Sequence, residues 1–121
     1  MHGPERSRFC RRLRLRRRGE FERLFKEGNR AGDHRLQVWA MPNDLGYSRF
    51  GLVVGRRHGS ACRRNRIKRV LREAFRLSRP KLPNGLDIVC APRVGAEIEL
   101  HKTIESLVRV TGRLAHGLAS E

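Results

Sequence analysis

The chain has 121 residues, a length that suits one domain built around a single hydrophobic core. Its 28 Lys and Arg against 12 Asp and Glu give a formal net charge of +16, which opposes compaction by self-repulsion. No apolar run is long enough to cross a membrane, and the basic N-terminus lacks the apolar segment of a signal peptide. We therefore expect a soluble, cytoplasmic protein with a polyanionic partner, and nucleic acid is favoured over a membrane surface.

The excess positive charge is concentrated in two blocks of the sequence. Residues 1–18 hold eight arginines and one acid, and residues 56–72 hold eight basic residues and no acid. The remaining 12 basic residues are nearly balanced by the other 11 acids. This concentration indicates a local binding surface rather than a generally basic protein.

The first element in chain order is a basic segment followed by an amphipathic helix. Residues 1–17 lack apolar periodicity and are predicted to form a flexible basic arm. The next stretch, "GEFERLFKEG" at 19–28, places Phe21, Leu24 and Phe25 on one helical face. A helix ending near the glycine at its end is therefore expected.

Two strands are predicted next. Residues 35–41 alternate, with Leu36 and Val38 on one face and Trp39 on the other, and "PNDLG" then supplies turn residues. Residues 47–55 form a second apolar run with the same period. We expect these two strands to pair as a hairpin, with room for a further short strand within 30–41.

The second half of the chain predicts helix, strand and helix. Ser60 is a candidate cap for a helix that runs to about Arg79, because Pro80 cannot continue it. A strand at 86–91 and a helix near 98–114 follow.

This order of elements predicts an α+β fold, an α/β sandwich with three helices packed on a small sheet. Residues 18–114 are expected to form one RNA-binding domain, and residues 115–121 a C-terminal tail.

The segment "RRNRIKRVLREAFR", residues 63–76, combines many arginines with a regular series of apolar residues, so its helix must have two different faces. At 100° per residue, one side collects the apolar residues Ile67, Val70, Leu71, Ala74 and Phe75. The opposite side collects Asn65, Lys68, Arg69, Arg72 and Arg76, with Arg66 on the flank. The helix should dock on the sheet and present arginines that bind phosphates, because the guanidinium group fits phosphate bidentately. Asn65 has two equally weighted readings, a contact to RNA or a polar residue of the first helical turn.

The same segment closely resembles the R-N-R-x-K-R-x-x-R-E-x-F signature of the bacterial ribonuclease P protein subunit. The stretches "FERLFKEG", "RFGLVVGRR" and "GLDIVCAPR" extend this resemblance over roughly residues 13–112. It implies a mixed sheet with an uncommon left-handed βαβ crossover around the arginine helix. It also implies a subunit that binds a catalytic RNA and precursor tRNA, while chemistry and Mg²⁺ reside mainly in the RNA and no organic cofactor is used.

The resemblance also assigns candidate residues to two sites. The residues expected to bind the catalytic RNA are Arg56, Arg57, Arg64, Asn65, Arg66, Lys68, Arg69, Arg72 and Arg76. A cleft beside the first helix is expected to receive the single-stranded 5′ leader of precursor tRNA on Phe21, Phe25 and Trp39. From the residues alone, Phe21 and Phe25 would be ordinary core residues.

Other functions are weighed against this one. A structural RNA-binding protein, such as a ribosomal component, would use the same cationic helix. An autonomous nuclease is disfavoured because the five histidines form no metal-ligand pattern and no paired acids mark a two-metal site, so no catalytic or metal-binding side chain is assigned. His58 lies beside Arg56 and Arg57, and we interpret it as a loop residue.

Overall fold

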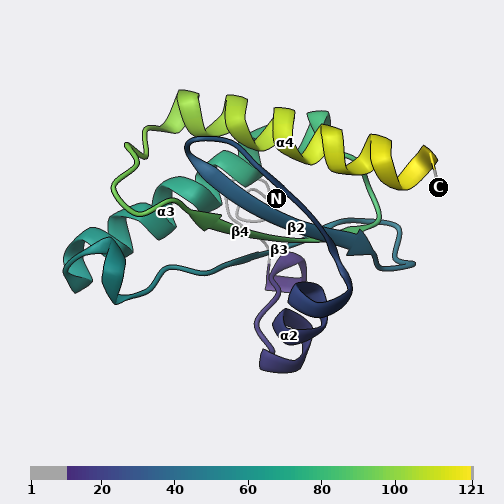
Figure 1. Ribbon diagram of the computed structural model, residues 1–121, viewed down its shortest axis with the longest axis horizontal. Helices are drawn as coiled ribbons and strands as arrows, with labels where there is room; N and C mark the ends of the chain where they lie inside the picture. Colours follow the sequence, from purple (N-terminus) through teal and green to yellow (C-terminus); the bar gives the residue numbers. More distant parts are fainter. Residues whose placement is uncertain (1–10, 121) are drawn as a thin grey trace, which may run out of the picture.

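The structure is a computed structural model that describes residues 11–120. A four-stranded sheet lies between two layers of helices, with α3 and α4 on one face and α2 on the other (Figure 1). The helices are α2 (Arg18–Glu27), α3 (Ala61–Ser78) and α4 (Leu100–Ser120), and the strands are β1 (Asn29–Gly32), β2 (Leu36–Pro42), β3 (Arg49–Leu52) and β4 (Leu86–Pro92). The predicted α+β fold with three helices and a small mixed sheet is confirmed.

The sheet has the order β1-β2-β4-β3, and its topology corrects one prediction. The expected hairpin between residues 35–41 and 47–55 does not form, because β4 pairs with β2 antiparallel and with β3 parallel and so separates them. The turn residues after β2 do reverse the chain, but β4, which contains the β-branched residues Ile88 and Val89, lies between β2 and β3. The antiparallel hairpin is formed instead by β1 and β2, and β1 is the short additional strand that the sequence allowed for.

The main core lies between the sheet and the layer of α3 and α4. Its fully buried residues include Val38, Ile88, Leu71 and Leu107, so β2, β4, α3 and α4 all contribute. Phe50 of β3 stacks on Phe75 of α3, with ring centroids 4.4 Å apart. The apolar side of α3 is therefore buried as predicted.

The opposite face of the sheet carries a smaller core under α2. Leu24 of α2 packs there with Val89 of β4 and Leu15, which precedes α2. The aromatic residues Phe21 and Trp39 border this small core and are only partly buried.

Residues 11–17 correct the expectation of a flexible arm. Leu13 and Leu15 are each 3% exposed, and the Leu15 N–H donates a hydrogen bond of 2.9 Å to the Phe50 carbonyl. Arg14 forms a parallel bridge with Phe50, so this segment extends the sheet at its β3 edge. The rest of the predicted arm, residues 1–10, lies outside the described residues.

The last helix also differs from its predicted bounds. α4 begins at Leu100 and continues to Ser120, so residues 115–120, expected as a tail, belong to the helix. Ala115 packs against the main core, which explains why the helix extends past residue 114. Within the described part of the chain, α4 and the other helices are too short or too polar to span a bilayer.

Candidate nucleic-acid interface

The N-terminus of α3 is fixed by a capped turn. The Ser60 hydroxyl accepts a hydrogen bond of 3.2 Å from the Arg63 N–H, as the sequence predicted. Gly59 just before it has a φ of 119°, a conformation that side-chain-bearing residues rarely adopt. This turn sets where the arginines of the first helical turns point.

The polar side of α3 forms a row of cations along the helix, which we call the cationic face. It consists of Arg63, Arg64, Asn65, Arg66, Lys68, Arg69 and Arg72, and every member is exposed or partly exposed. Among the described residues, none of the six basic members forms an ion pair. Their charge is therefore available to an external polyanion.

Two shallow depressions lie along the cationic face. One of about 380 Å³ is lined by Asn65, Lys68, Arg69, Arg72 and Glu73. The other, of about 640 Å³, lies towards the helix start and shares Asn65 and Arg69 with the first. Asn65 is thus at the centre of the face, where its amide can reach a ligand lying across either depression.

Arg76 differs from the other candidates on α3. Its guanidinium pairs with the Glu73 carboxylate one turn earlier, and the Nε–Oε1 distance is 3.0 Å. The hydrogen bond from Arg76 lowers the pKa of Glu73, so this carboxylate stays charged. Arg76 therefore contributes less positive potential to the face than its position in the sequence suggested.

The segment before α2 adds a cation that sequence reasoning missed. Burial and the nearby charge of Arg14 both lower the pKa of Arg72, so Arg14 lies close to the cationic face. Arg14 reaches this place because Leu13 and Leu15 are buried on either side of it. The alternation in "RLRLR", residues 12–16, is the sequence signal for this arrangement.

Arg56 and Arg57 lie in a short 3₁₀ helix, Arg56–His58, directly before the capped turn, and both are exposed. His58 anchors this helix to the sheet. Its Nδ1 accepts a hydrogen bond from the Gly55 N–H, and its Nε2 donates one of 2.7 Å to the Pro92 carbonyl. His58 therefore has a structural role that holds the two arginines in place.

The predicted leader-binding residues come together on the other face of the sheet. The rings of Phe25 and Trp39 meet edge to face with centroids 4.8 Å apart, and Phe21 lies 6.4 Å from Phe25. Phe25 is 43% exposed, whereas Phe21 and Trp39 are partly buried. We call these three residues the aromatic cluster.

Two neighbours complete the surroundings of the aromatic cluster. Gly51 of β3 leaves room for the Phe21 ring, because a Cβ at this position would lie 2.5 Å from Phe21 Cε1. Arg30 is directly opposite Trp39 in the β1–β2 register, so both side chains share the face that carries the cluster. Arg30 is exposed, and sequence reasoning missed it because the pairing of β1 was not predicted.

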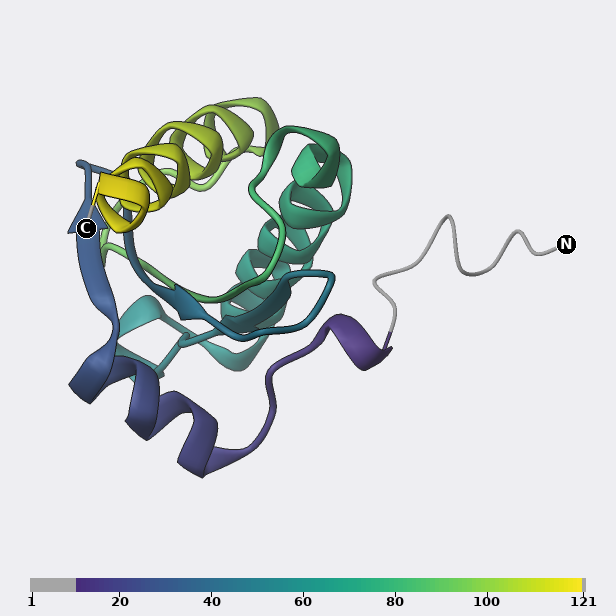
Figure 2. The same cartoon turned by 90° about the vertical axis from the view of Figure 1, so that its right-hand side faces the viewer.

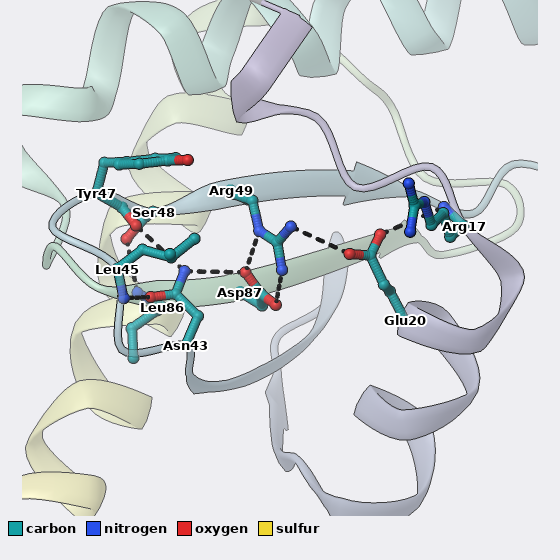
Figure 3. Close-up of polar contacts among 9 residues, drawn as sticks. All are labelled: Arg17, Glu20, Asn43, Leu45, Tyr47, Ser48, Arg49, Leu86 and Asp87. Atoms are coloured by element: carbon teal, nitrogen blue, oxygen red, sulfur yellow. Dashed lines mark hydrogen bonds and ion pairs between the residues drawn. The ribbon is translucent and has the colours of Figure 1, made fainter.

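A polar network holds α2 on the sheet (Figure 3). Arg49 of β3 binds both carboxylate oxygens of Asp87 on β4, at 2.8 and 2.7 Å, and reaches Glu20 of α2 at 3.1 Å. Asn43 donates to the same Asp87 carboxylate and to the Tyr47 carbonyl, so the loop between β2 and β3 joins the network. The hydrogen bonds that Arg49 donates to Asp87 raise the pKa of Arg49, which keeps this central group cationic.

The described residues contain no group of three or more His, Cys, Asp or Glu side chains placed to hold a metal ion. What the interface offers instead is donor groups and aromatic surface, which suit phosphates and unpaired bases.

Comparison with known proteins identifies the family. The family model for ribonuclease P matches residues 9–115. The ribonuclease P protein component of Thermotoga petrophila is 48% identical over 85 residues, which cover 70% of this chain and 73% of that protein. That of Photobacterium profundum is 36% identical over 113 residues, covering 90% and 96% of the two chains.

Solved structures agree with this relationship. The ribonuclease P protein of Thermotoga maritima superimposes with a TM-score of 0.76 at 37% identity, covering 83% of this chain and 96% of that one. The Staphylococcus aureus protein gives a TM-score of 0.74 at 26% identity, covering 84% and 94%. On the evidence of the matching family model and these relatives, the chain belongs to the family of ribonuclease P protein components, which are parts of an endoribonuclease complex that contains RNA.

Proposed function

We propose that this chain is the protein subunit of a ribonuclease P ribonucleoprotein, which removes the 5′ leader from precursor tRNA. In this proposal the cationic face of α3 binds the catalytic RNA. The aromatic cluster on the opposite side of the sheet receives the unpaired leader of the substrate.

The observation that carries the proposal is the separation of these two surfaces. The basic residues of the cationic face form no ion pair with any described residue, and rings from α2 and β2 gather on the opposite face of the sheet. Guanidinium groups bind the phosphates of structured RNA, whereas rings stack on unpaired bases of any sequence. One small domain can therefore bind a folded RNA and a single-stranded leader at the same time.

The protein side chains bind and orient both RNAs, and the cleavage step is assigned to the catalytic RNA. Among the described residues, the carboxylates that line the depressions along the cationic face are Glu73 and Glu97. Glu73 is engaged by Arg76 and Glu97 by Lys102. They are therefore poorly suited to hold Mg²⁺, and we assign the magnesium ions to the RNA.

Reconstitution with the cognate catalytic RNA tests the proposal. The protein alone should cleave nothing, but it should accelerate 5′ maturation of precursor tRNA at low magnesium concentration. The variant Arg66→Ala/Arg69→Ala should bind the catalytic RNA more weakly and lower the salt slope of log K by up to about two units. Robust cleavage by RNA-free protein, or a reconstituted enzyme indifferent to the protein, would contradict the proposal and favour a nuclease or a structural RNA-binding role.

The same assay tests leader binding with a separate variant. Phe25→Ala removes the most exposed ring of the aromatic cluster, and stacking on one base contributes about 1–3 kcal/mol. The variant should lose preference for leader-bearing over mature tRNA while keeping its affinity for the catalytic RNA. If the preference for leader-bearing tRNA is unchanged, the Phe25 ring serves packing and does not bind the leader.

A further inference from the structure

A second group of arginines lies at the β1 edge of the sheet, and we call this group the β1-edge surface. It consists of Arg35, Arg93, Arg109 and Arg113, from the β1–β2 turn, the segment after β4, and α4. In Figure 2, β1 with α4 above it lies at the left, and α3 lies at the right. The β1-edge surface is thus carried by elements other than α3, although Glu97, whose carbonyl binds Arg35, also lines a depression with Arg63 and Arg66 of the cationic face.

Specific contacts hold these arginines in position. Arg93 donates from Nε to the Asp33 carbonyl at 3.1 Å, and Arg113 donates to the Gly32 carbonyl at 3.4 Å. Arg35 reaches across to the Glu97 carbonyl at 3.1 Å. Three of the four guanidinium groups thus bind neutral backbone carbonyls, which order the side chains but leave the positive charge uncompensated.

Only one carboxylate in the turn balances these charges. Asp33 pairs with Arg109 and also accepts hydrogen bonds of 2.8 Å from the N–H groups of Arg35 and Leu36. Burial acts to raise the pKa of Asp33, but these hydrogen bonds hold it well below its usual value. Asp33 is therefore fully occupied as an internal anchor, and the surface retains a net positive charge.

The surrounding acids do not cancel the remainder. Glu97 forms an ion pair with Lys102. Glu105, one turn before Arg109 on α4, has no ion-pair partner among the described residues, so it lowers the net charge of the surface by one and leaves the surface cationic. Each guanidinium carries five N–H donors, and most of those on Arg93 and Arg113 have no partner within the described part of the chain. Ordered donors that remain unused are what a phosphate ligand requires.

We propose that the β1-edge surface binds the phosphodiester backbone of the catalytic RNA at a second place, distinct from the segment bound by α3. This inference rests on the proposed function, which supplies the RNA partner. Arg109 and Arg113 of this surface lie on α4, in the helical layer that α4 shares with α3, whereas the aromatic cluster for the substrate leader lies on the opposite face of the sheet. A large structured RNA can reach both edges of the layer.

A nucleic acid fits this surface better than a protein partner does. Protein interfaces are centred on buried aromatic or large apolar anchors. The large apolar side chains that are exposed are Phe25, Leu45, Leu77 and Val94 among the described residues, and only Val94 adjoins the β1-edge surface. Charge rather than apolar area is therefore what this surface offers.

The test compares three double variants of the full chain in salt titrations of binding to the catalytic RNA. Arg93→Gln/Arg113→Gln removes two exposed charges, and the salt slope of log K should fall by up to about two units. Arg93→Lys/Arg113→Lys keeps the charges and should retain most of the slope. Arg79→Gln/Lys81→Gln removes the same charge from the short 3₁₀ helix that follows α3, Arg79–Lys81, outside both surfaces, and should change the slope much less.

Hydroxyl-radical cleavage from an iron chelate attached at Arg113→Cys, in a variant whose other accessible cysteines are serine, locates the contact. It should cut the catalytic RNA at nucleotides different from those cut from position 66. A slope for Arg93→Gln/Arg113→Gln equal to that of the control, or no cutting from position 113, overturns the second contact. If Arg66→Ala/Arg69→Ala still lowers the slope in that case, the proposed function stands; if neither variant lowers it, both fail.

Discussion

Arg49 is the residue on which the placement of α2 depends most directly. Its guanidinium joins Asp87 of the central strand to Glu20 of α2, and the side chains of Arg49 and Asp87 are only 24% and 12% exposed. Removing the cation would leave Asp87 with Asn43 as its remaining side-chain partner among the described residues. A carboxylate so enclosed is costly without its counter-charge.

Arg49→Met should therefore lower the free energy of unfolding by about 2–4 kcal/mol, because the side chain keeps its length but loses its charge. Arg23→Met is the matched control, since the Arg23–Glu27 pair is exposed on both sides and should contribute less than about 0.5 kcal/mol. Urea unfolding of both variants measures the difference. Equal effects would mean that the Arg49 network adds nothing beyond a surface ion pair.

The roles of single residues were only partly visible in the sequence. The amphipathic period of α3 predicted the buried face, because one helix face is decided by local spacing. Of its five apolar residues only Val70 is partly buried, and the buried Ser78 was not predicted. The pairing of Arg76 with Glu73 is also consistent with their spacing of three residues on the helix. It was not predicted because Arg76 was grouped with the RNA-binding arginines. Contacts such as Arg49 with Asp87 join positions far apart in the chain, so no local pattern predicts them.

Among the elements, α2 is the one whose position decides whether the aromatic cluster faces solvent. Phe21 packs directly over Gly51, and a Cβ there would also lie 3.0 Å from Leu15 Cβ. Gly51→Ala should push the Phe21 ring and α2 away from the sheet. Overpacking of this kind costs about 1–3 kcal/mol.

Two measurements on Gly51→Ala follow from this geometry. Its free energy of unfolding should fall by that amount, and its preference for leader-bearing tRNA should weaken because Phe21 moves relative to Trp39. Gly46→Ala is the control, since a Cβ at Gly46 would meet no atom within 4 Å. A Gly51→Ala variant as stable and as selective as the wild type would show that the ring adjusts without cost.

The pairing of the elements was less predictable than their existence. Turn residues after β2 indicated a chain reversal, but a reversal does not determine which strand becomes the neighbour. β4 pairs with both β2 and β3, and its side chains are buried on both faces of the sheet, as suits a central strand. The segment around Arg14 was expected to be part of a flexible arm because residues 1–17 as a whole lack apolar periodicity, and the alternation of Leu13 and Leu15 is too short to stand out.

At the scale of the whole molecule, the fold creates charge patterns that composition conceals. Outside the two basic blocks the sequence is nearly neutral, yet the fold collects Arg35, Arg93, Arg109 and Arg113 at one edge. Asp33 balances Arg109 at this edge, but other acids in the count lie elsewhere, such as Asp87, which pairs with Arg49. Counting charges along the chain therefore located the cationic face of α3 but not the β1-edge surface.

This distribution predicts how salt changes the stability of the free protein. A formal net charge of +16 destabilises the folded state by self-repulsion, while the exposed ion pairs of α2 contribute little. Raising the potassium chloride concentration from about 0.01 M to about 1 M shortens the Debye length from about 30 Å to about 3 Å. The free energy of unfolding should therefore rise with salt, by an amount on the order of 1 kcal/mol.

Urea unfolding at several salt concentrations measures this dependence, and Arg66→Gln/Arg69→Gln provides the comparison. Because this variant removes two cations that form no ion pair with a described residue, its stability should start higher at low salt and respond less to added salt. Stability that falls with salt in the wild type would show that attractive pairs such as Arg49 with Asp87 outweigh the repulsion. The excess positive charge would then not lower the free energy of unfolding, and neutralisation by bound RNA would not stabilise the fold.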